Sequence, residues 1–311
     1  MRILHLSDTP LSGAPLRLSN MLKKHNKDVM SAHVTWTDKV GYRDFGYDLL
    51  GCRESKESLD YLIYEWADII HYHNRWKRQE IFKFLGKWPP KKPSVIQIHS
   101  PRFSEGFLEE INSGVPLAVI AQYHVRQWPE LSYIVPNVVD ITELAPVKKP
   151  ASIVPKISFA PSNTTCGGWD NKGYHEVMQI LKPMKHTAGI TLDLINQRPF
   201  SEAIERKAYA DLGIDEIVTG SYHLSGLEYL ALGVGCFSGI DAQTEKVLKD
   251  LTGCAEQPFI RADKNSFKRI LNRILMDGSW HGLGESAREW MEKYWSPQLL
   301  SEHYLNMYRR L

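Results

Sequence analysis

Short apolar runs alternate with helix-like segments along the first half of the chain. Residues 2–7 form the first apolar run, a loop of Pro, Ser and Gly follows, and residues 15–25 then carry apolar side chains at helical spacing. Further strand-like runs lie at 29–36, 68–72, 94–99, 117–121 and 133–135, with helix-like segments at 56–66, 79–85 and 105–112. This alternation predicts a parallel sheet covered by helices on both faces.

A stretch with three prolines and paired lysines, 140–155, interrupts the pattern, and we expect the domain linker there. The alternation then restarts. Its strand-like runs are 157–160, 190–195, 216–218 and 235–238, and its helical segments are 174–185, 201–210, 227–232 and a tail that ends in 296–311. The sequence therefore predicts an α/β fold with two Rossmann-like, doubly wound domains.

The stretch 220–235 is the most informative single segment. A polar, glycine-containing loop runs into an apolar helix that stops at Gly233. Ser225 is a candidate N-cap, and the backbone N–H groups from Gly226 onward would then be open to a phosphate. The carboxylate of Glu228 would repel that phosphate, so it needs a hydroxyl-bearing partner, such as the ribose beside a diphosphate.

Composition and charge exclude few classes of protein. The chain has 311 residues, enough for two domains, and a net charge of +2, which supports no global argument for nucleic acid or membrane. The four cysteines show no CxxC or zinc-type spacing, which favours reduced thiols. The start of the chain does not resemble a signal peptide and no run approaches a membrane span, so we expect a cytoplasmic protein, either free or peripheral to a membrane or DNA.

Seven segments in order along the chain resemble GT-B glycosyltransferases, and among them the retaining family 4-type enzymes. These segments are 2–7 with 12–14, 68–73, 95–99, 134–140, 172–173, 227–233 and 295–297. The resemblance implies an acceptor domain over 1–145, a nucleotide-sugar donor domain over 156–295 facing it across a cleft, and a terminal helix, 296–311, that packs on the first domain. It also implies an enzyme that moves a sugar from a nucleotide-sugar to a hydroxyl group with retention.

The resemblance also implies the site residues. For donor binding they are Gly13, Ser162, Asn163, Lys172, Ser225, Gly226, Leu227 and Glu228. For catalysis they are His99 and Lys172, to which we add Tyr222 and His223 because these precede the donor-site helix, where the transferred sugar would lie. The plain alternatives are a surface turn at Gly13, a solvated lysine at 172, a hydrogen-bonded strand-end histidine at 99 and loop packing at 222–223.

The chain departs from the family pattern at two places. Family 4-type enzymes carry a second glutamate eight positions before the one at 228, and Gly220 stands there. The arginine that normally accompanies the phosphate-binding lysine has no counterpart in 162–168. The sequence has no Asp-x-Asp motif and no His/Cys cluster with metal-ligand spacing, so we expect lysine and helix dipoles to replace a metal ion, with no cofactor beyond the nucleotide-sugar.

The acceptor is expected to be anionic. The segment 69–103 carries eight basic residues against one acidic residue, interleaved with aromatic side chains. The residues assigned to acceptor binding are Arg75, Trp76, Lys77, Arg78 and Arg102. A lipid-linked or polysaccharide acceptor at a membrane surface and a hydroxylated base in DNA both fit, the latter as in phage enzymes that modify hydroxymethylpyrimidines.

Two other classes of function stay open at this point. The first is a non-catalytic protein that binds nucleotide-sugar or nucleic acid on a GT-B scaffold, which the glycine at 220 and the missing arginine allow. The second is a Rossmann oxidoreductase, which is disfavoured because no GxGxxG follows the first apolar run.

Overall fold

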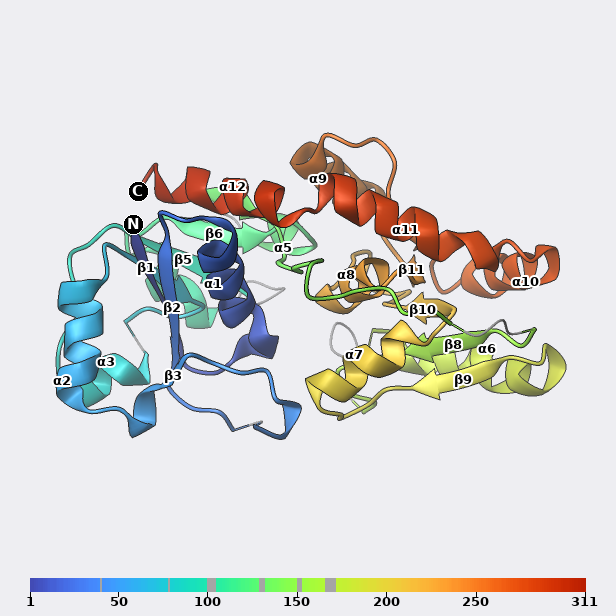
Figure 1. Cartoon of the computed structure of the whole chain (residues 1–311), viewed down its shortest axis with the longest axis horizontal. Coiled ribbons are helices and arrows are strands. Elements are labelled where there is room, and N and C mark those ends of the chain that lie inside the picture. Colours follow the sequence, from blue (N-terminus) through green and yellow to red (C-terminus); the bar gives the residue numbers. More distant parts are fainter. Residues whose placement is uncertain (40, 78, 100–104, 129–131, 150–152, 166–171) are drawn as a thin grey trace. The chain divides into compact units, whose positions relative to one another are not determined.

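Strands and helices alternate along the chain in the computed structural model (Figure 1), which describes residues 1–39, 41–77, 79–99, 105–128, 132–149, 153–165 and 172–311. The chain divides into two compact units, Met1–Val138 with Pro297–Leu311 and Val139–Ser296. Each unit contains one parallel sheet, as the alternating pattern predicts. None of the helices in the described part of the chain has the length and apolarity that crossing a membrane requires.

The first unit has a sheet of seven strands in the order β3-β2-β1-β4-β5-β6-β7. The strands are β1 (Arg2–Ser7), β2 (Met30–Thr35), β3 (Leu49–Leu50), β4 (Ile69–His73), β5 (Ser94–Ile98), β6 (Leu117–Ile120) and β7 (Tyr133–Val135). The helices are α1 (Ala14–His25), α2 (Lys56–Asp60), which continues as a π-helix over Tyr61–Trp66, α3 (Glu80–Leu85), α4 (Leu108–Ile111), α5 (His124–Gln127) and α12 (Pro297–Tyr308). The C-terminal helix thus belongs to the unit that contains the N-terminus.

One face of this first sheet is an apolar core. Leu4 and Leu6 of β1 and Ile70 of β4 are fully buried and pack with Leu59 of α2 and Ile81 of α3. Because residues at i and i+2 of a strand share a face, the alternate positions form the opposite face.

That opposite face is polar although it is buried. Its side chains include His5, Ser7, His33, His71 and His73, each at most 2% exposed. Helices from both ends of the chain contribute partners on this side, since Ser31 donates to Ser19 of α1 and His71 Nδ1 lies 2.7 Å from the Tyr308 hydroxyl of α12. Burying so many polar side chains requires partners for them, and the sequence pattern does not predict this layer.

The second unit has a sheet of five strands in the order β12-β11-β10-β8-β9. The strands are β8 (Lys156–Phe159), β9 (Thr191–Leu194), β10 (Leu212–Ile214), β11 (Gly235–Ser238) and β12 (Ile260–Arg261). The helices are α6 (Tyr174–Thr187), α7 (Phe200–Ala208), α8 (Leu224–Ala231), α9 (Ala242–Thr252), α10 (Phe267–Asp277) and α11 (Trp280–Tyr294). Phe159, Ile214 and Phe237 form the centre of its core with Val177 of α6 and Phe267 of α10.

Two sequence-based boundaries in this unit are wrong. The strand expected at 216–218 is β10 at Leu212–Ile214, which the pattern hides because its middle residue is Gly213. A Cβ at Gly213 would lie 2.5 Å from the Tyr229 ring, so this aromatic side chain excludes any larger residue. Helix α8 begins at Leu224, earlier than the expected start at Leu227.

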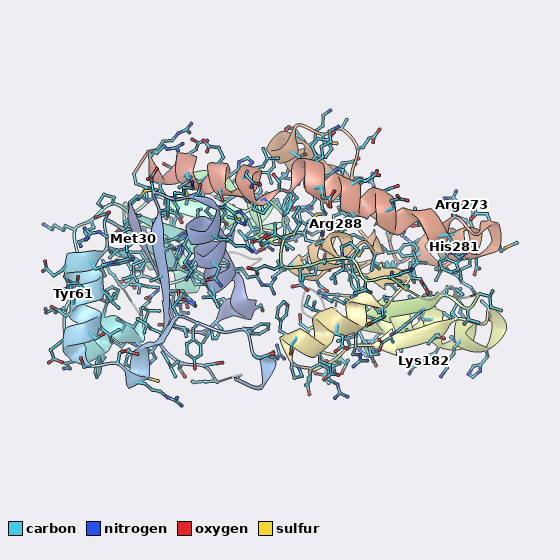
Figure 2. The ribbon with its side chains drawn as sticks, in the orientation of Figure 1. Met30, Tyr61, Lys182, Arg273, His281 and Arg288 are labelled. Carbon is cyan, nitrogen blue, oxygen red and sulfur yellow. The ribbon has the colours of Figure 1, made fainter. Side chains whose placement is uncertain are left out.

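Helix α8 is anchored at its C-terminal end by Arg288 of α11, labelled in Figure 2. The Arg288 guanidinium donates to the carbonyl of Ala231 at 2.5 Å, of Leu144 at 2.7 Å and of Ile141 at 3.2 Å. A cation at this end also complements the negative end of the helix dipole. The anchor fixes the axis of α8 and hence the position of its N-terminus.

Candidate functional site

Four charged side chains are buried together in the second unit, beside the N-terminus of α8. They are Lys172, Lys207, Asp215 and Glu228, each at most 8% exposed. Lys172 lies just before α6, Lys207 in the last turn of α7, Asp215 directly after β10 and Glu228 in α8. The carboxyl ends of parallel strands are where α/β proteins bind ligands, so this cluster is the strongest candidate site in the unit.

Asp215 is the acceptor at the centre of one half of the cluster. Its Oδ1 lies 3.3 Å from Lys172 Nζ. Its Oδ2 accepts from the backbone N–H of His223 at 2.6 Å and lies 3.3 Å from His223 Nδ1. Gly226 is required here, because a Cβ at that position would lie 2.8 Å from Asp215 Oδ2.

Lys207 forms the other half of the cluster. Its Nζ donates to Glu228 Oε2 at 2.5 Å and to Ser225 Oγ at 2.8 Å, and lies 4.9 Å from the centre of the Tyr229 ring. Tyr229 in turn accepts a hydrogen bond from Ser158 Oγ at 2.7 Å. Lys207 is thus a second buried cation of this unit, in addition to Lys172.

The ionisation of the cluster follows from its burial and pairing. Burial lowers the pKa of Lys207, while the Glu228 carboxylate opposes the shift and the charge of Lys172 adds to it. Burial alone would raise the pKa of Asp215, but His223 and Lys172 outweigh it and the pKa lies below the ordinary value. Since the charges of Lys172 and Lys207 influence one another, the two cations belong to one electrostatic site.

The start of α8 differs from the expected phosphate site. The N-cap is His223, not Ser225, and the side chain of Ser225 is occupied by Lys207. The backbone N–H groups of Gly226 and Leu227 both donate to the His223 carbonyl, so they are not open to a ligand. The two amides expected to bind an anion are therefore occupied in this conformation, and Lys207 of the cluster lies beside them at Ser225.

The loop before α8 is held by buried carboxylates. Glu216 accepts from the backbone N–H groups of Val218, Thr219 and Gly239, the first at 2.6 Å and the last at 2.8 Å. Gly220 has φ +73°, and a Cβ there would lie 2.7 Å from Asp241 Oδ2. The place left by the missing glutamate is thus bordered by another carboxylate, that of Asp241, the N-cap of α9.

A pocket of about 630 Å³ opens beside this loop. Its lining includes Gly220, Gly239 and Asp241 as well as Glu176 of α6 and Arg261 of β12. The pocket therefore presents both carboxylate acceptors and a guanidinium donor, which are the groups that hydrogen-bond hydroxyl-rich ligands.

Tyr222 and His223 differ in what they can contact. Tyr222 is fully buried, and its ring stacks on Phe259 with the ring centres 5.5 Å apart. Tyr222 therefore has no exposed surface in this structure, and its expected catalytic role stays a prediction. His223 is 7% exposed and paired with Asp215, so it belongs to the charged cluster.

The other residues expected at the donor site lie in the loop that follows the first strand of each unit. Gly13, at φ +77°, caps α1 after β1 in the first unit. Ser162 and Asn163 follow β8 in the second unit, and Asn163 Oδ1 accepts from the Thr165 N–H at 3.2 Å.

Lys172 has φ +52°, a left-handed conformation that costs a non-glycine residue about 1–2 kcal/mol. Strain of this kind, borne by a buried lysine, supports a functional role.

His99 directly follows β5 in the first unit, and its side chain lies beside another histidine. Its Nε2 lies 2.8 Å from His73 Nδ1, and its backbone N–H donates to Asn74 Oδ1 at 2.8 Å. Burial lowers the pKa of His99 to about 3, so the imidazole is neutral.

The expected acceptor surface is less cationic than the sequence indicates. Trp76 packs against the apolar core, and Lys77 lies 4.0 Å from Glu109. Arg75 is exposed, and its guanidinium lies over the Phe107 ring. Arg78 and Arg102 lie outside the described residues. Acids distant in sequence thus neutralise part of the local excess of positive charge.

Sequence reasoning missed Lys207, Asp215 and Asp241. Lys207 carries no signal, since it lies among other charged residues of an amphipathic helix. Asp215 follows a buried strand directly, a position that indicates a ligand edge, but the misplaced strand at 216–218 concealed it. The sequence does not indicate that Asp241 lies beside Gly220, because only the fold brings the two residues together.

No protein-family model and no curated protein matches this sequence. Solved structures of glycosyltransferases match it over nearly its whole length. An alpha-glucosyltransferase in complex with UDP and a DNA 13-mer containing an HMU base matches with a TM-score of 0.67 and 12% identity, covering 99% of both chains. HepE from Anabaena, in complex with UDP and glucose, matches with a TM-score of 0.63 and 13% identity over 100% of both chains.

A third match is the sucrose-phosphate synthase of Thermosynechococcus elongatus, with a TM-score of 0.58 and 12% identity, covering 100% of this chain and 99% of that one. These likenesses confirm the GT-B fold that the sequence resemblance predicts. The low identities agree with a divergent example of this fold.

Proposed function

We propose that this chain is a glycosyltransferase that moves a sugar from a nucleotide-sugar donor to a hydroxyl group, with retention and without a metal ion. The observation that carries the proposal is the pair of buried lysines, Lys172 and Lys207, on the donor-side unit of a GT-B fold. A nucleoside diphosphate leaving group needs cationic stabilisation as it departs. Two lysines that are already positioned supply it without a divalent ion.

The lysines would act on the leaving group. As the bond between the sugar C1 and the phosphate oxygen breaks, negative charge grows on the diphosphate, and the two ammonium groups stabilise that charge. In a same-face reaction, the acceptor oxygen bonds to C1 and its proton moves to the departing phosphate oxygen. This course needs no pair of carboxylates of the glycosidase kind.

Two carboxylates would bind the rest of the donor. Glu228 would accept from the ribose hydroxyls while Lys207 holds its Oε2 in place. Asp241 would stand at the transferred sugar, where it borders the space beside Gly220. His99, a neutral imidazole at a strand end of the first unit, would hydrogen-bond the sugar or the acceptor hydroxyl.

For the acceptor we propose a hydroxylated base in DNA. The similarity over 99% of both chains to an alpha-glucosyltransferase bound to HMU-containing DNA supports this choice. The exposed Arg75 at the end of β4 would contact phosphate, which positions a protein on DNA without reading its sequence. A lipid-linked acceptor is the alternative outcome of the test below.

The test separates donor binding from transfer. Thermal unfolding is measured with UDP, GDP and ADP for the wild type, Glu228→Gln and the surface control Lys246→Met, whose side chain is 73% exposed. We expect one nucleotide to raise the midpoint in the wild type and in the control but not in Glu228→Gln. A wild type that responds to none of the three nucleotides contradicts the proposal.

Transfer is then followed by mass spectrometry. The protein is incubated with a panel of nucleotide-sugars and either hydroxymethylated DNA or lipid extract, with and without EDTA. A sugar added to the DNA base, at an equal rate with EDTA, supports the whole proposal. Nucleotide binding with no transfer to either pool would instead identify a non-catalytic binding protein.

A further inference from the structure

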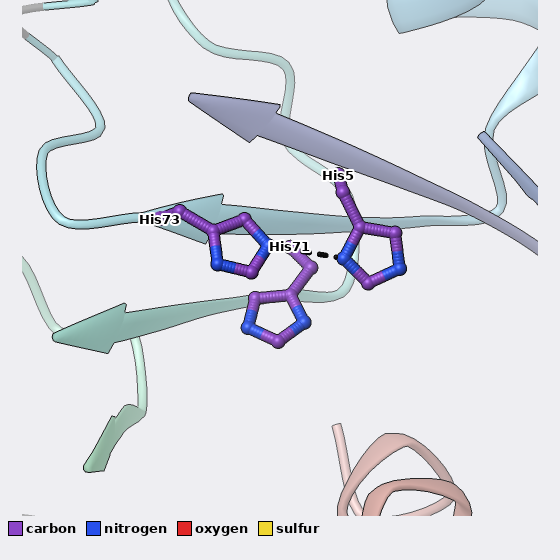
Figure 3. Close-up of side chains that lie close together, drawn as sticks. All are labelled: His5, His71 and His73. Carbon is purple, nitrogen blue, oxygen red and sulfur yellow. Dashed lines mark hydrogen bonds between the residues drawn. The ribbon is translucent and has the colours of Figure 1, made fainter. Parts of the chain in front are cut away.

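A group of three histidines lies inside the first unit, on the polar face of its sheet (Figure 3). His5 belongs to β1, and His71 and His73 belong to β4. The parallel register places His5 directly beside His71, and His73 shares the face of His71 because it is two residues further along the strand. The sequence offers no cluster with metal-ligand spacing, but strand pairing assembles one.

The geometry points to a binding site for a divalent transition-metal ion, Zn²⁺ above all, held by one ring nitrogen each from His5, His71 and His73. Three such nitrogens lie within 4.8 Å of one another. His5 Nδ1 and His73 Nε2 are 3.1 Å apart. Nitrogens bound to zinc at about 2.0–2.1 Å in a tetrahedral site lie about 3.3–3.4 Å apart, so one pair is already close to that spacing.

The side chains are of a kind that binds metal ions. All three are imidazoles inside the unit, each at most 2% exposed. Neutral imidazole is a preferred ligand of zinc and of the neighbouring first-row ions. A protein interior that only needed filling would use apolar residues at these positions, as the opposite face of the same sheet does.

Outer hydrogen bonds orient two of the rings. His73 Nδ1 lies 2.8 Å from His99 Nε2, which leaves its Nε2 turned toward His5. His71 Nδ1 lies 2.7 Å from the Tyr308 hydroxyl, which brings a neutral oxygen to the edge of the cluster. Histidines that bind metal are usually held in this way by a second partner.

Hydrogen bonds among the described residues do not use every nitrogen of the cluster. His5 Nε2 and His71 Nε2 are buried and have no partner among those residues. An unsatisfied buried polar atom is costly and rare in folded proteins. An ion bound by His71 Nε2 would give that buried nitrogen a partner.

This ion would join β1 to β4 and would not take part in sugar transfer, so the inference does not rest on the proposed function. Because the cluster is buried, the ion would enter during folding. The test therefore refolds protein without a histidine tag in the presence of Zn²⁺ or of Co²⁺ as a spectroscopic probe, and removes free metal before analysis. Cys52, an exposed thiol, is replaced by serine throughout to remove one competing ligand.

We expect one equivalent of Zn²⁺ per chain and tetrahedral d–d absorption with Co²⁺. At a free Zn²⁺ concentration of 100 times Kd, the thermal midpoint should rise by roughly 5–10 °C for a unit of this size. Tyr308→Phe should weaken binding by about 10–100-fold, as the loss of an orienting partner does, and His71→Gln by more.

The matched control is His186→Gln, which alters an exposed histidine of α6 in the other unit and should leave the stoichiometry unchanged. A wild type that retains no Zn²⁺ or Co²⁺ after refolding overturns the inference whatever the variants do. Equal binding by His71→Gln, judged on folded protein by its circular dichroism, overturns it as well. In either case the histidines form a hydrogen-bonded layer only.

Discussion

Lys207 is the residue at which the structure makes its sharpest quantitative prediction. Its side chain is 4% exposed and that of Glu228 is 7% exposed, so the two charges are shielded from water. Lys207→Met keeps most of the apolar stem but leaves the Glu228 carboxylate buried without this cation. Removing one partner of a buried ion pair costs about 3–5 kcal/mol, and we expect a loss of unfolding free energy in that range.

The double variant Lys207→Met with Glu228→Gln should recover most of this loss, because the uncompensated negative charge is then absent. The control is Lys246→Met. Lys246 pairs with Asp250 at 2.5 Å, but the two side chains are 73% and 60% exposed. An exposed pair four residues apart on a helix contributes only about 0.3–0.5 kcal/mol.

Urea unfolding followed by tryptophan fluorescence measures all three variants. The reasoning is refuted if Lys207→Met is no less stable than Lys246→Met, or if the double variant is as unstable as Lys207→Met alone. Either result would mean that the pair is more hydrated than the structure indicates. Nucleotide binding by the double variant is a separate measurement, and we expect it to be lost because the second cation is absent.

Three further predictions concern the loops around the same site. Gly220→Ala should lower the unfolding free energy more than Gly253→Ala. Both positions have positive φ, but only at Gly220 would a Cβ contact another atom, Asp241 Oδ2 at 2.7 Å. Urea denaturation of the two variants measures the difference. Asp215→Asn should be less stable at neutral pH, and its stability should fall less steeply than that of the wild type as the pH drops below about 4. Because the folded pKa of Asp215 is below the ordinary 3.8, its contribution is complete above that value and is lost as the pH falls below it, which unfolding at several pH values tests. Ser158→Ala should cost about 1–3 kcal/mol in thermal or urea unfolding, because the buried Tyr229 hydroxyl loses this donor, and adding Tyr229→Phe should recover part of the loss.

The fold could be predicted from the sequence because its main determinants are local. Strands such as β5 and β6 are continuous apolar runs, and buried parallel strands give this pattern wherever the chain places them. The strand β10 was misplaced because Gly213 belongs to it, and the reason for that glycine is the ring of Tyr229, which is distant in sequence. A contact between residues distant in sequence cannot be predicted from a local pattern.

The candidate site was predicted only in part for a similar reason. Lys172 and Glu228 belong to motifs that can be recognised in the sequence, whereas Lys207 contacts Glu228 only because α7 packs against α8. The positively charged segment 69–103 was overestimated because Glu109 and Asp60, which pair with Lys77 and Lys87, lie outside it. A charge count over one segment leaves out acidic partners that the fold brings close from other segments.

The pairing of each buried lysine with a carboxylate explains how the site can exist before a donor arrives. Two ammonium groups buried together would repel one another. Asp215 beside Lys172 and Glu228 beside Lys207 balance these two positive charges with two negative ones, which holds both side chains in place. In the proposed reaction, an arriving diphosphate would meet cations whose positions were already fixed during folding. We therefore expect the carboxylates to support the proposed chemistry by holding the two lysines in position. The sequence motif alone does not indicate this role.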